Sequence, residues 1–376
     1  MTPPYAPRVG DSITTLDTPS MIVDLDIMER NIARLMGRLL PTGVRVRPHL
    51  KTTKSTALAK RMVSAGATGG CVAKLSEAEA MAAAGFDDLL ITCEIIGPAK
   101  VRRLVALHAA HPGRIMIVVD SAAGADAIDA ALAAADPPLP PIPVLIDVDV
   151  GLHRTGVPPG KPALALARHV ADTLPRLHMV GLQGYEGHLQ HVHSRAEREA
   201  ACRAAMADLV ATAALLRGAG LDMGVVTTGG TGTAEFCASV PGVTEVQPGS
   251  FIFMDTDYRA AVGGDVFAYS LTILATVLSL QGTNSATIDT GLKSLTTDSG
   301  LAQCKDPRYT YACMGDEHGA LSWDDSEGTP PLNIGDRVEM VPSHIDPTVN
   351  LHDVYYAHRD GVIEEIWPVD TRGKVQ

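Results

Sequence analysis

Strand-like runs alternate with helical runs through the first two thirds of the chain, and this alternation limits the fold more than any other feature. The strand-like runs cover residues 44–48, 69–73, 88–92, 114–119, 144–150, 178–185, 224–230 and 244–249. Eight strands alternating with helices predict a TIM-type (β/α)8 barrel, an α/β fold. An open doubly wound sheet is the alternative, but it usually has fewer strands and a glycine-rich loop after the first one.

Residues typical of helix ends flank several of the helical runs. Gly66, Gly85 and Gly218 each follow an Ala/Leu-rich run, which predicts helix ends there. Ser76 followed by Glu79 is typical of a capping box, and it predicts a helix that begins at Ser76.

From about residue 265 the pattern changes to strands separated by turns, without helical runs between them. These strands are expected within residues 267–280, 285–291, 308–314, 337–346 and 353–369. They predict an antiparallel β domain, which the early strand Ser20–Leu25 can join. We therefore predict a cofactor-binding barrel at residues 26–262 and a β-strand domain formed by residues 1–25 and 263–376.

Composition narrows the class of protein. The chain has 31 Lys and Arg against 43 Asp and Glu, a net charge of −12, which argues against a nucleic-acid surface. No signal-peptide pattern or membrane-length apolar run is found, so no membrane partner is expected. The six cysteines form no CxxC pair and indicate reduced thiols. We expect a cytoplasmic protein that binds a small molecule.

Polar residues after the predicted strands are active-site candidates, because barrels place the site at the C-terminal ends of their strands. Lys51 and Lys54 follow the first strand in RPHLKTTK. A desolvated lysine can attack a carbonyl group, although most single lysines are simply solvated. Arg154 follows the fifth strand, where it can bind an anionic oxygen or pair with Asp147 or Asp149.

Two glycine-containing loops follow the seventh and eighth strands, TTGGTGT (227–233) and QPGS (247–250). Each is a weak signal alone, because such loops occur at many turns. Barrels commonly bind phosphate after these two strands. A lysine after the first strand together with this phosphate cradle suggests pyridoxal 5′-phosphate.

A histidine-rich segment, GYEGHLQHVHS, follows the sixth strand and contains His188, His191 and His193. The spacing HxxHxH is not one of the usual zinc arrangements, and no cysteine is near in sequence. One of these imidazoles can serve as a general base. The alternative is a solvated connection into the next helix.

The segment PSHID places His344 two residues before Asp346 at the end of a predicted strand. In an extended segment, residues i and i+2 point to the same face. The pair is therefore either half of a metal site or part of a hydrogen-bonded turn.

Taken together, these segments resemble the D-threonine aldolase / D-serine dehydratase family of fold-type III, alanine racemase-like pyridoxal-phosphate enzymes. The resemblance extends over nearly the whole chain, in the family's order. The matching segments are TPSMIVDLD, RPHLKTTK, GLHRTGV, GLQGYEGHLQH, TTGGTGT, EVQPGSFIFMD, GDEHG and PSHIDPTVNLHD.

The resemblance implies a role for each candidate. Lys51 would hold the cofactor covalently, with Lys54 as the alternative, and Arg154 would bind the cofactor's O3′ oxygen. Gln247 stands where alanine racemase has an arginine, and Ser55 stands where that enzyme has a tyrosine base, which argues against racemisation. The remaining cofactor-binding residues would be Tyr185, Thr228, Gly230, Thr231, Gly249 and Ser250.

The pair His344-x-Asp346 selects among family members. The D-serine dehydratase branch has His-x-Cys, which binds zinc, whereas an imidazole with a carboxylate suits Mn²⁺ or Mg²⁺. The resemblance therefore implies a metal-dependent lyase of the D-threonine aldolase type, cleaving D-3-hydroxy amino acids to glycine and an aldehyde. The base would be His191 or a hydroxide on the metal.

Three alternatives stay open, and the fold group also implies a homodimer. The same site can eliminate water from D-serine or 3-hydroxy-D-aspartate, or cleave 3-hydroxy-D-aspartate as an aldolase. A non-catalytic pyridoxal-phosphate-binding protein is the third, but small barrels of that kind lack the β domain and the metal pair.

Overall fold

The computed structural model describes residues 5–324, 326 and 328–376, and they divide into two compact units. The barrel unit comprises Arg34–Lys51, Thr56–Gly249 and Gly373–Gln376, and the strand unit comprises Met1–Ala33, Thr52–Ser55 and Ser250–Arg372. The division falls inside helix α1 (Leu25–Leu39). The domain boundaries expected after residues 25 and 262 stay a prediction.

The barrel unit contains a sheet of eight parallel strands in the order β2-β9-β8-β7-β6-β5-β4-β3. Backbone hydrogen bonds from Thr68 to Val46 and from Cys71 to Pro48 join the two ends of this order. The strands are β2 (Arg45–Val46), β3 (Gly70–Val72), β4 (Leu89–Ile91), β5 (Ile115–Val119), β6 (Ile142–Asp147), β7 (Leu177–Gln183), β8 (Val225–Thr228) and β9 (Glu245–Val246).

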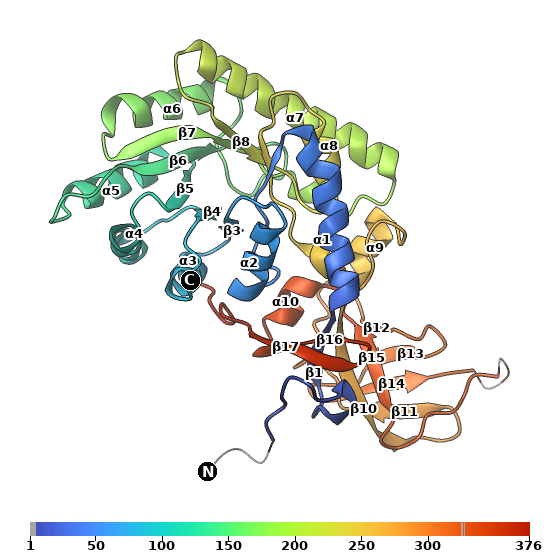
Figure 1. Ribbon diagram of the computed structural model, residues 1–376. Helices are drawn as coiled ribbons and strands as arrows, with labels where there is room; N and C mark the ends of the chain where they lie inside the picture. Colours follow the sequence, from blue (N-terminus) through green and yellow to red (C-terminus); the bar gives the residue numbers. More distant parts are fainter. Residues whose placement is uncertain (1–4, 325, 327) are drawn as a thin grey trace. The chain divides into compact units, whose positions relative to one another are not determined.

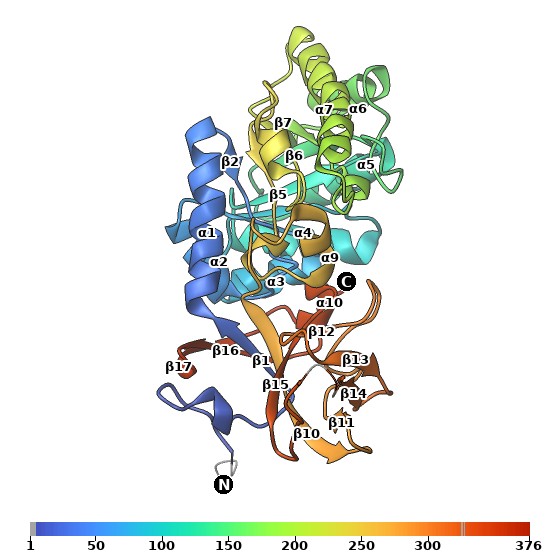
Figure 2. The same ribbon diagram turned by 90° about the vertical axis from the view of Figure 1, so that its right-hand side faces the viewer.

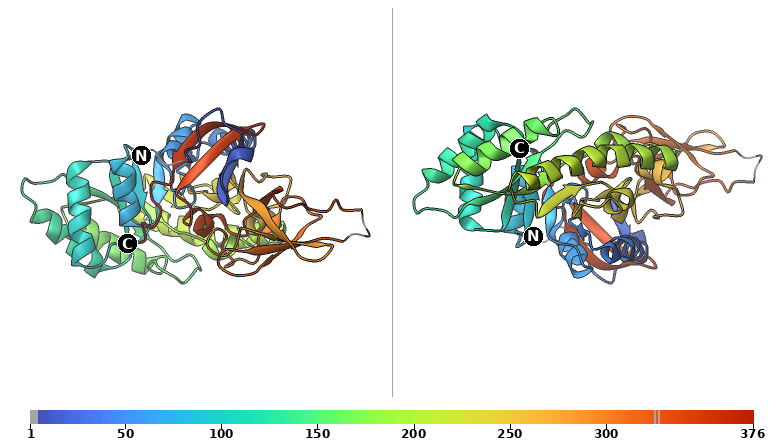
Figure 3. Two further views of the ribbon diagram at one scale, coloured as in Figure 1. Left: turned by 90° about the horizontal axis from the view of Figure 1, so that it is seen from below. Right: turned by 90° about the horizontal axis from the view of Figure 1, so that it is seen from above.

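Helices follow the strands in turn, and α3 to α6 lie along the outer side of the curled sheet (Figure 1). Seen from above, α5, α6 and α7 follow one another as neighbours (Figure 3). The helices are α2 (Thr56–Ser64), α3 (Leu75–Ala83), α4 (Pro98–Ala110), α5 (Ala122–Ala133), α6 (Lys161–Thr173), α7 (Arg195–Gly218) and α8 (Ala234–Ala238).

Buried apolar side chains explain why these strands form the centre of the unit. Cys71, Leu90, Val118 and Leu145 come from four neighbouring strands and pack into one cluster with no exposed surface. Strands covered on both faces read as continuous apolar runs, and β3, β4 and most of β5 and β6 have that pattern.

The predicted start of α3 is wrong. Helix α3 begins at Leu75, and the Glu77 carboxylate accepts hydrogen bonds from the backbone N–H groups of Ala73 and Lys74. Ser76 lies inside the first turn, where its hydroxyl donates to the carbonyl of Gln376. The Glu that caps this helix is therefore two residues earlier than the sequence pattern indicated.

The strand unit contains a largely antiparallel sheet in the order β13-β14-β11-β10-β1-β16-β17, with β15 pairing with β10 and β12 (Figure 2). As predicted, the early strand joins it: β1 lies between β10 and β16. The elements are β1 (Ser20–Asp24), α9 (Thr256–Val262), β10 (Leu271–Leu280), β11 (Ser285–Ile288), β12 (Gln303–Cys304), β13 (Thr310–Cys313), β14 (Gly319–Ser322), β15 (Arg337–Val341), α10 (Ile345–Val349), β16 (Val354–Arg359) and β17 (Val362–Pro368).

The predicted architecture is thus confirmed: a (β/α)8 barrel with an additional antiparallel β-sheet. Short 3-10 helices complete it, namely η1 (Ile13–Thr15), η2 (Leu40–Thr42), η3 (Gly187–Leu189) and η4 (Ser250–Ile252). In the part of the chain that the structure describes, no helix has the length and hydrophobicity needed to cross a bilayer.

Candidate active site

A narrow cleft lies at the C-terminal ends of the barrel strands. Thr92 follows β4, Asp147 ends β6 and Gln183 ends β7, and all three line this cleft together with Arg154 and Tyr185. The Arg154 guanidinium carbon lies 5.6 Å from the centre of the Tyr185 ring. The strand-end rule thus brings Arg154 and Tyr185 to one place, as predicted for the mouth of a barrel.

The alternative role of Arg154, an ion pair with Asp147 or Asp149, is not observed among the described residues. Asp149 accepts hydrogen bonds from the backbone and ring of His153. Asp147 accepts hydrogen bonds from Gln183 and Thr155. Arg154 is exposed, and its charge is available for a ligand.

The two candidate lysines fall in different units. Lys51 belongs to the barrel unit, in the turn after β2, where its backbone N–H donates to Nδ1 of His49 at 3.4 Å. Nε2 of His49 lies 3.1 Å from Thr92 Oγ1, which anchors this turn to the end of β4. Lys54 belongs to the strand unit, is 7% exposed and has a left-handed φ of 49°. The choice of Lys51 over Lys54 as the cofactor lysine stays a prediction.

A chain of hydrogen bonds connects Gln247 with two carboxyl groups of the barrel. The Gln247 amide donates to Gln183 Oε1 at 3.2 Å and to Thr227 Oγ1 at 2.9 Å. The Gln183 amide donates in turn to Asp147 at 2.9 Å.

Glu94 ends this chain as a protonated acid. Burial raises the pKa of Glu94 to about 8, and the neighbouring charge of Asp147 adds to the shift. At neutral pH the Glu94 carboxyl therefore keeps its proton and acts as the hydrogen-bond donor to the Asp147 carboxylate.

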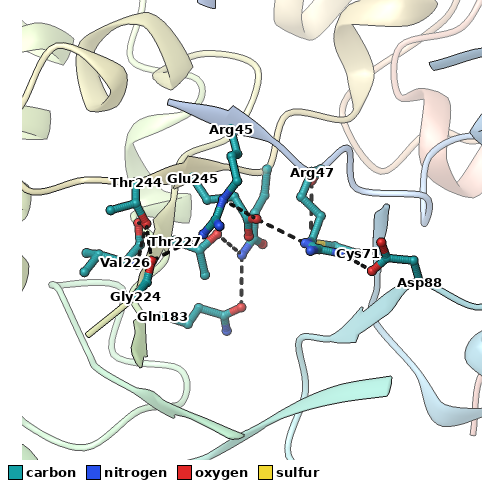
Figure 4. A network of polar contacts seen from close by, with 11 residues as sticks. Arg45, Arg47, Cys71, Asp88, Gln183, Gly224, Val226, Thr227, Thr244 and Glu245 are labelled. Atoms are coloured by element: carbon teal, nitrogen blue, oxygen red, sulfur yellow. Dashed lines mark hydrogen bonds and ion pairs between the residues drawn. The ribbon is translucent and has the colours of Figure 1, made fainter. Parts of the chain in front are cut away.

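The barrel also contains a buried ion pair that has a structural role. Arg47 pairs with Glu245 at 3.2 Å and with Asp88 at 3.0 Å, next to Cys71 (Figure 4). Both Arg47 and Glu245 are almost fully buried. Burial raises the pKa of the Cys71 thiol well above its ordinary value, so this cysteine is a packed, unreactive thiol.

The glycine loop after β8 is largely hydrogen-bonded within the barrel unit. The N–H groups of Gly229, Gly230 and Gly232 donate to Glu186, Thr233 and Gln190, respectively. Thr228 and Thr231 are buried, and the Thr228 hydroxyl donates to Glu186. Gly249 and Ser250 follow β9, and Ser250 begins η4. The phosphate-binding role of these five predicted residues stays a prediction.

The three histidines after β7 are separated rather than clustered. His188 lies in η3 and is exposed, His193 is exposed, and His191 is half-buried in the connection from η3 to α7. None of them belongs to a described group of three residues with ligand atoms close enough for one metal ion. The histidine-rich segment therefore gives no support to a zinc site, and His191 remains the candidate base.

Glu186, Cys202 and Cys237 are the described group of three whose ligand atoms all lie within 4.8 Å. Their chemistry does not suit a metal. The Glu186 oxygens already accept from Thr228, Gly229, Gln190 and Thr233. The hydrogen bond from Cys202 and burial raise the pKa of Cys237 well above its ordinary value, whereas a metal needs the thiolate.

The PSHID segment differs from the extended strand end that the sequence predicted. Strand β15 ends at Val341, His344 is the N-cap residue of α10, and Asp346 lies in the first helical turn. The argument that an extended backbone brings both side chains to one face is therefore wrong. Both residues lie at the start of a short helix instead.

Asp298 and Asp255 are partners of this helix that the sequence did not reveal. Asp298 Oδ2 lies 2.5 Å from His344 Nδ1, and this hydrogen bond helps to lower the pKa of the Asp298 carboxyl against the effect of its burial. Asp255 accepts hydrogen bonds from the N–H groups of Tyr258 and Ile345, so it caps both α9 and α10. Burial raises the pKa of Asp255 to about 6.

Comparison with known proteins gives matches over the whole chain. A family model for the N-terminal domain of alanine racemase matches residues 23–257, and one for a putative serine dehydratase domain matches residues 270–358. The D-threonine aldolase of Arthrobacter sp is 40% identical over 99% of this chain and 96% of its own length. The 3-hydroxy-D-aspartate aldolase of Paracoccus denitrificans is 35% identical over 99% of this chain and 95% of its own length. The crystal structure of D-threonine aldolase from Filomicrobium marinum superposes with a TM-score of 0.92 at 37% identity, covering 98% of this chain and all of that one.

Proposed function

Because the chain belongs to the D-threonine aldolase / D-serine dehydratase family, a lyase family with an alanine racemase-like barrel, we propose that it cleaves D-3-hydroxy-α-amino acids of the D-threonine type. The products would be glycine and an aldehyde. The observation that carries the proposal is the motif His344-x-Asp346, which has a carboxylate in place of a cysteine, in a chain whose barrel has Lys51 after β2.

The residues of the barrel unit fit pyridoxal 5′-phosphate. Lys51 in the turn after β2 would hold the cofactor, and the exposed guanidinium of Arg154 beside Tyr185 would bind its O3′ oxygen. Gly229 has a φ of +80°, and a Cβ at Gly230 would lie 2.6 Å from Gln190, so this loop needs glycine. We propose Thr228, Gly230, Thr231 and Gly249 of this unit, together with the next residue along the chain, Ser250, as the phosphate-binding residues, and Gln247 as the residue facing the ring nitrogen.

The residues around α10 fit a divalent cation. The Nδ1 atom of His344 is hydrogen-bonded to Asp298, which leaves Nε2 as its metal-binding atom. Asp346 adds a carboxylate, and the absence of sulfur in this pair favours Mn²⁺ or Mg²⁺ over zinc. We propose His344 and Asp346 as the metal ligands.

When bound, the cofactor supplies an electron sink for the charge left at Cα, and the cation supplies a Lewis acid for the β-hydroxyl oxygen. His191 would take the proton of that hydroxyl as the Cα–Cβ bond breaks and the aldehyde leaves. Return of a proton to Cα would then complete glycine.

Incubation of the metal-supplemented protein with D-threonine, L-threonine and D-serine tests the proposal. Glycine and acetaldehyde should form from D-threonine alone. Ammonia and a keto acid from D-serine would instead support the dehydratase alternative, which the match to a putative serine dehydratase domain favours. Formation of neither set of products would contradict both.

A further inference from the structure

Glu186 is a fully buried carboxylate that the proposed chemistry does not use. It has no exposed surface, and it follows β7. Its Oε2 accepts from Thr228 Oγ1 at 2.8 Å and from the Gly229 N–H at 3.3 Å. Its Oε1 accepts from Thr233 Oγ1 at 2.5 Å and from Gln190 Nε2 at 3.1 Å. Three of these four donors belong to residues 228–233, the glycine loop between β8 and α8.

Gln190 and Arg198 hold the same loop from the same side. Gln190 Oε1 accepts from the Gly232 N–H at 2.9 Å, and its Nε2 also donates to Thr233 Oγ1 at 2.9 Å. Arg198, in α7, donates from Nε to the Gly232 carbonyl at 2.9 Å. Glu186, Gln190 and Arg198 are all almost completely buried. The connection from β7 to α7 thus fixes the backbone of the loop after the adjacent strand.

The glycines of the loop leave room for this contact. A Cβ at Gly230 would lie 2.6 Å from Gln190 Oε1, and a Cβ at Gly232 would lie 2.3 Å from the Gln190 carbonyl oxygen. Side chains at either position would push the loop away from Gln190. The requirement for glycine here therefore includes contact with the polar residues behind the loop, in addition to any contact with a ligand.

We propose that Glu186 and Gln190 are positioning residues for the cofactor phosphate: they hold the loop of residues 228–233 in its phosphate-binding shape without touching the phosphate. This inference rests on the proposed function, because it assumes that the loop binds the phosphate of pyridoxal 5′-phosphate. A loop held before binding loses less conformational entropy on binding, so its affinity for the ligand is higher.

The arrangement requires a carboxylate rather than an amide at residue 186. Both Glu186 oxygens face N–H donors whose directions are fixed, Gly229 on one side and Gln190 on the other. A glutamine in this position has only one oxygen, so its NH₂ group would face one of these two N–H groups. An unpaired buried donor is costly, and the loop would move to relieve it.

The test compares the affinities of the protein for pyridoxal 5′-phosphate and for pyridoxal, which lacks the phosphate. Both aldehydes bind through Lys51, so the ratio of their dissociation constants isolates the contribution of the phosphate. We expect Glu186→Gln to reduce this preference about tenfold and Glu186→Ala about a hundredfold, with the affinity for pyridoxal nearly unchanged. Thr233→Val, which removes one donor to Glu186, should reduce the preference less, and it serves if the Glu186 variants do not fold.

Glu245→Gln is the matched control, because Glu245 is equally buried in the same unit but pairs with Arg47. It should lower thermal stability while changing both affinities in parallel. An unchanged preference in the Glu186 and Thr233 variants would overturn the inference and leave the proposed function intact. A wild-type protein that does not prefer pyridoxal 5′-phosphate over pyridoxal would instead contradict the proposed function.

Discussion

The Glu186 carboxylate in the barrel unit and the carboxylates of Asp298 and Asp346 in the strand unit have contrasting surroundings. In the barrel unit, the Glu186 carboxylate accepts from backbone, hydroxyl and amide donors and has no exposed surface. In the strand unit, Asp298 and Asp346 are partly exposed, and Asp298 pairs with an imidazole, His344.

This difference shows which carboxylates can bind a cation. Donors that already occupy the carboxylate oxygens leave no lone pair for a metal, and so Glu186 stabilises a loop. A carboxylate bonded to one nitrogen of an imidazole orients the other nitrogen toward a ligand. The carboxylate group is the same in both units, and the donors around it decide its function.

The largest effect is expected from removing the lysine of the barrel. Lys51→Ala should abolish the visible absorbance of the lysine-bound cofactor and reduce turnover of D-threonine by roughly a thousandfold or more, because no other group can replace the covalent link. Absorbance spectra and initial rates measure both effects. Lys54→Met is the matched control and should keep the absorbance band; the opposite pattern would move the assignment to Lys54.

Replacing the proposed metal ligands of the strand unit should reduce catalysis without preventing the cofactor from binding. His344→Ala and Asp346→Asn should each reduce turnover by roughly a hundredfold, since a Lewis acid contributes several kcal/mol to the transition state. The visible absorbance band should persist in both variants. Treatment with EDTA should reproduce their loss of activity, and Mn²⁺ should restore activity only in the wild type. Full activity after EDTA would remove the cation from the proposal.

Asp298→Asn tests whether the Asp298 carboxylate orients the His344 ring for metal binding. The variant keeps the shape of the side chain but weakens the hydrogen bond to His344, so we expect a tenfold to hundredfold loss in affinity for Mn²⁺. Titration of the metal-free protein while following activity measures this affinity. At saturating Mn²⁺ the turnover number should approach that of the wild type. Unchanged metal affinity would show that the pair has no part in orienting His344.

The fold was largely predictable because its signals are local and repeated. Eight strand-like runs correspond to eight strands, and the run at Ser20–Leu25 became β1. The predicted runs extended beyond the strands because the chain stops pairing with the neighbouring strands at the barrel mouth. The fifth run, for example, was predicted to reach residue 150, whereas β6 ends at Asp147. Strands β12 and β14 were missed, since two and four residues, respectively, give little pattern.

The site was predictable only as a set of residue types at strand ends. The sequence selected Lys51, Arg154, His344 and Asp346 as candidates, and their roles stay predictions. It predicted an extended backbone for His344 and Asp346, whereas both lie at the start of α10. Asp298 and His344 are 46 residues apart in the sequence, and Glu186 and Thr233 are 47 residues apart. A local sequence pattern therefore cannot predict either contact. The only available signal for Glu186 was its place directly after a barrel strand.

The smallest expected effect concerns the proton shared by Glu94 and Asp147. The pKa of Glu94 is about 8 in the folded chain against an ordinary value of 4.5, so between these values the folded state binds a proton that the unfolded state lacks. The free energy of unfolding should therefore fall as pH rises through this window.

Glu94→Gln should abolish this dependence, because its amide can donate to Asp147 at every pH. Relative to the variant, the wild type should lose about 1 to 2 kcal/mol between roughly pH 6 and pH 9, allowing for the partial exposure of Glu94. Urea unfolding at both pH values measures the difference. Glu79→Gln removes a half-buried carboxylate of the same unit, which pairs with Arg103, and should keep the wild-type slope. Parallel curves for the wild type and Glu94→Gln would mean that Glu94 is already ionised at neutral pH, and that Asp147 is held by Gln183 and Thr155 alone.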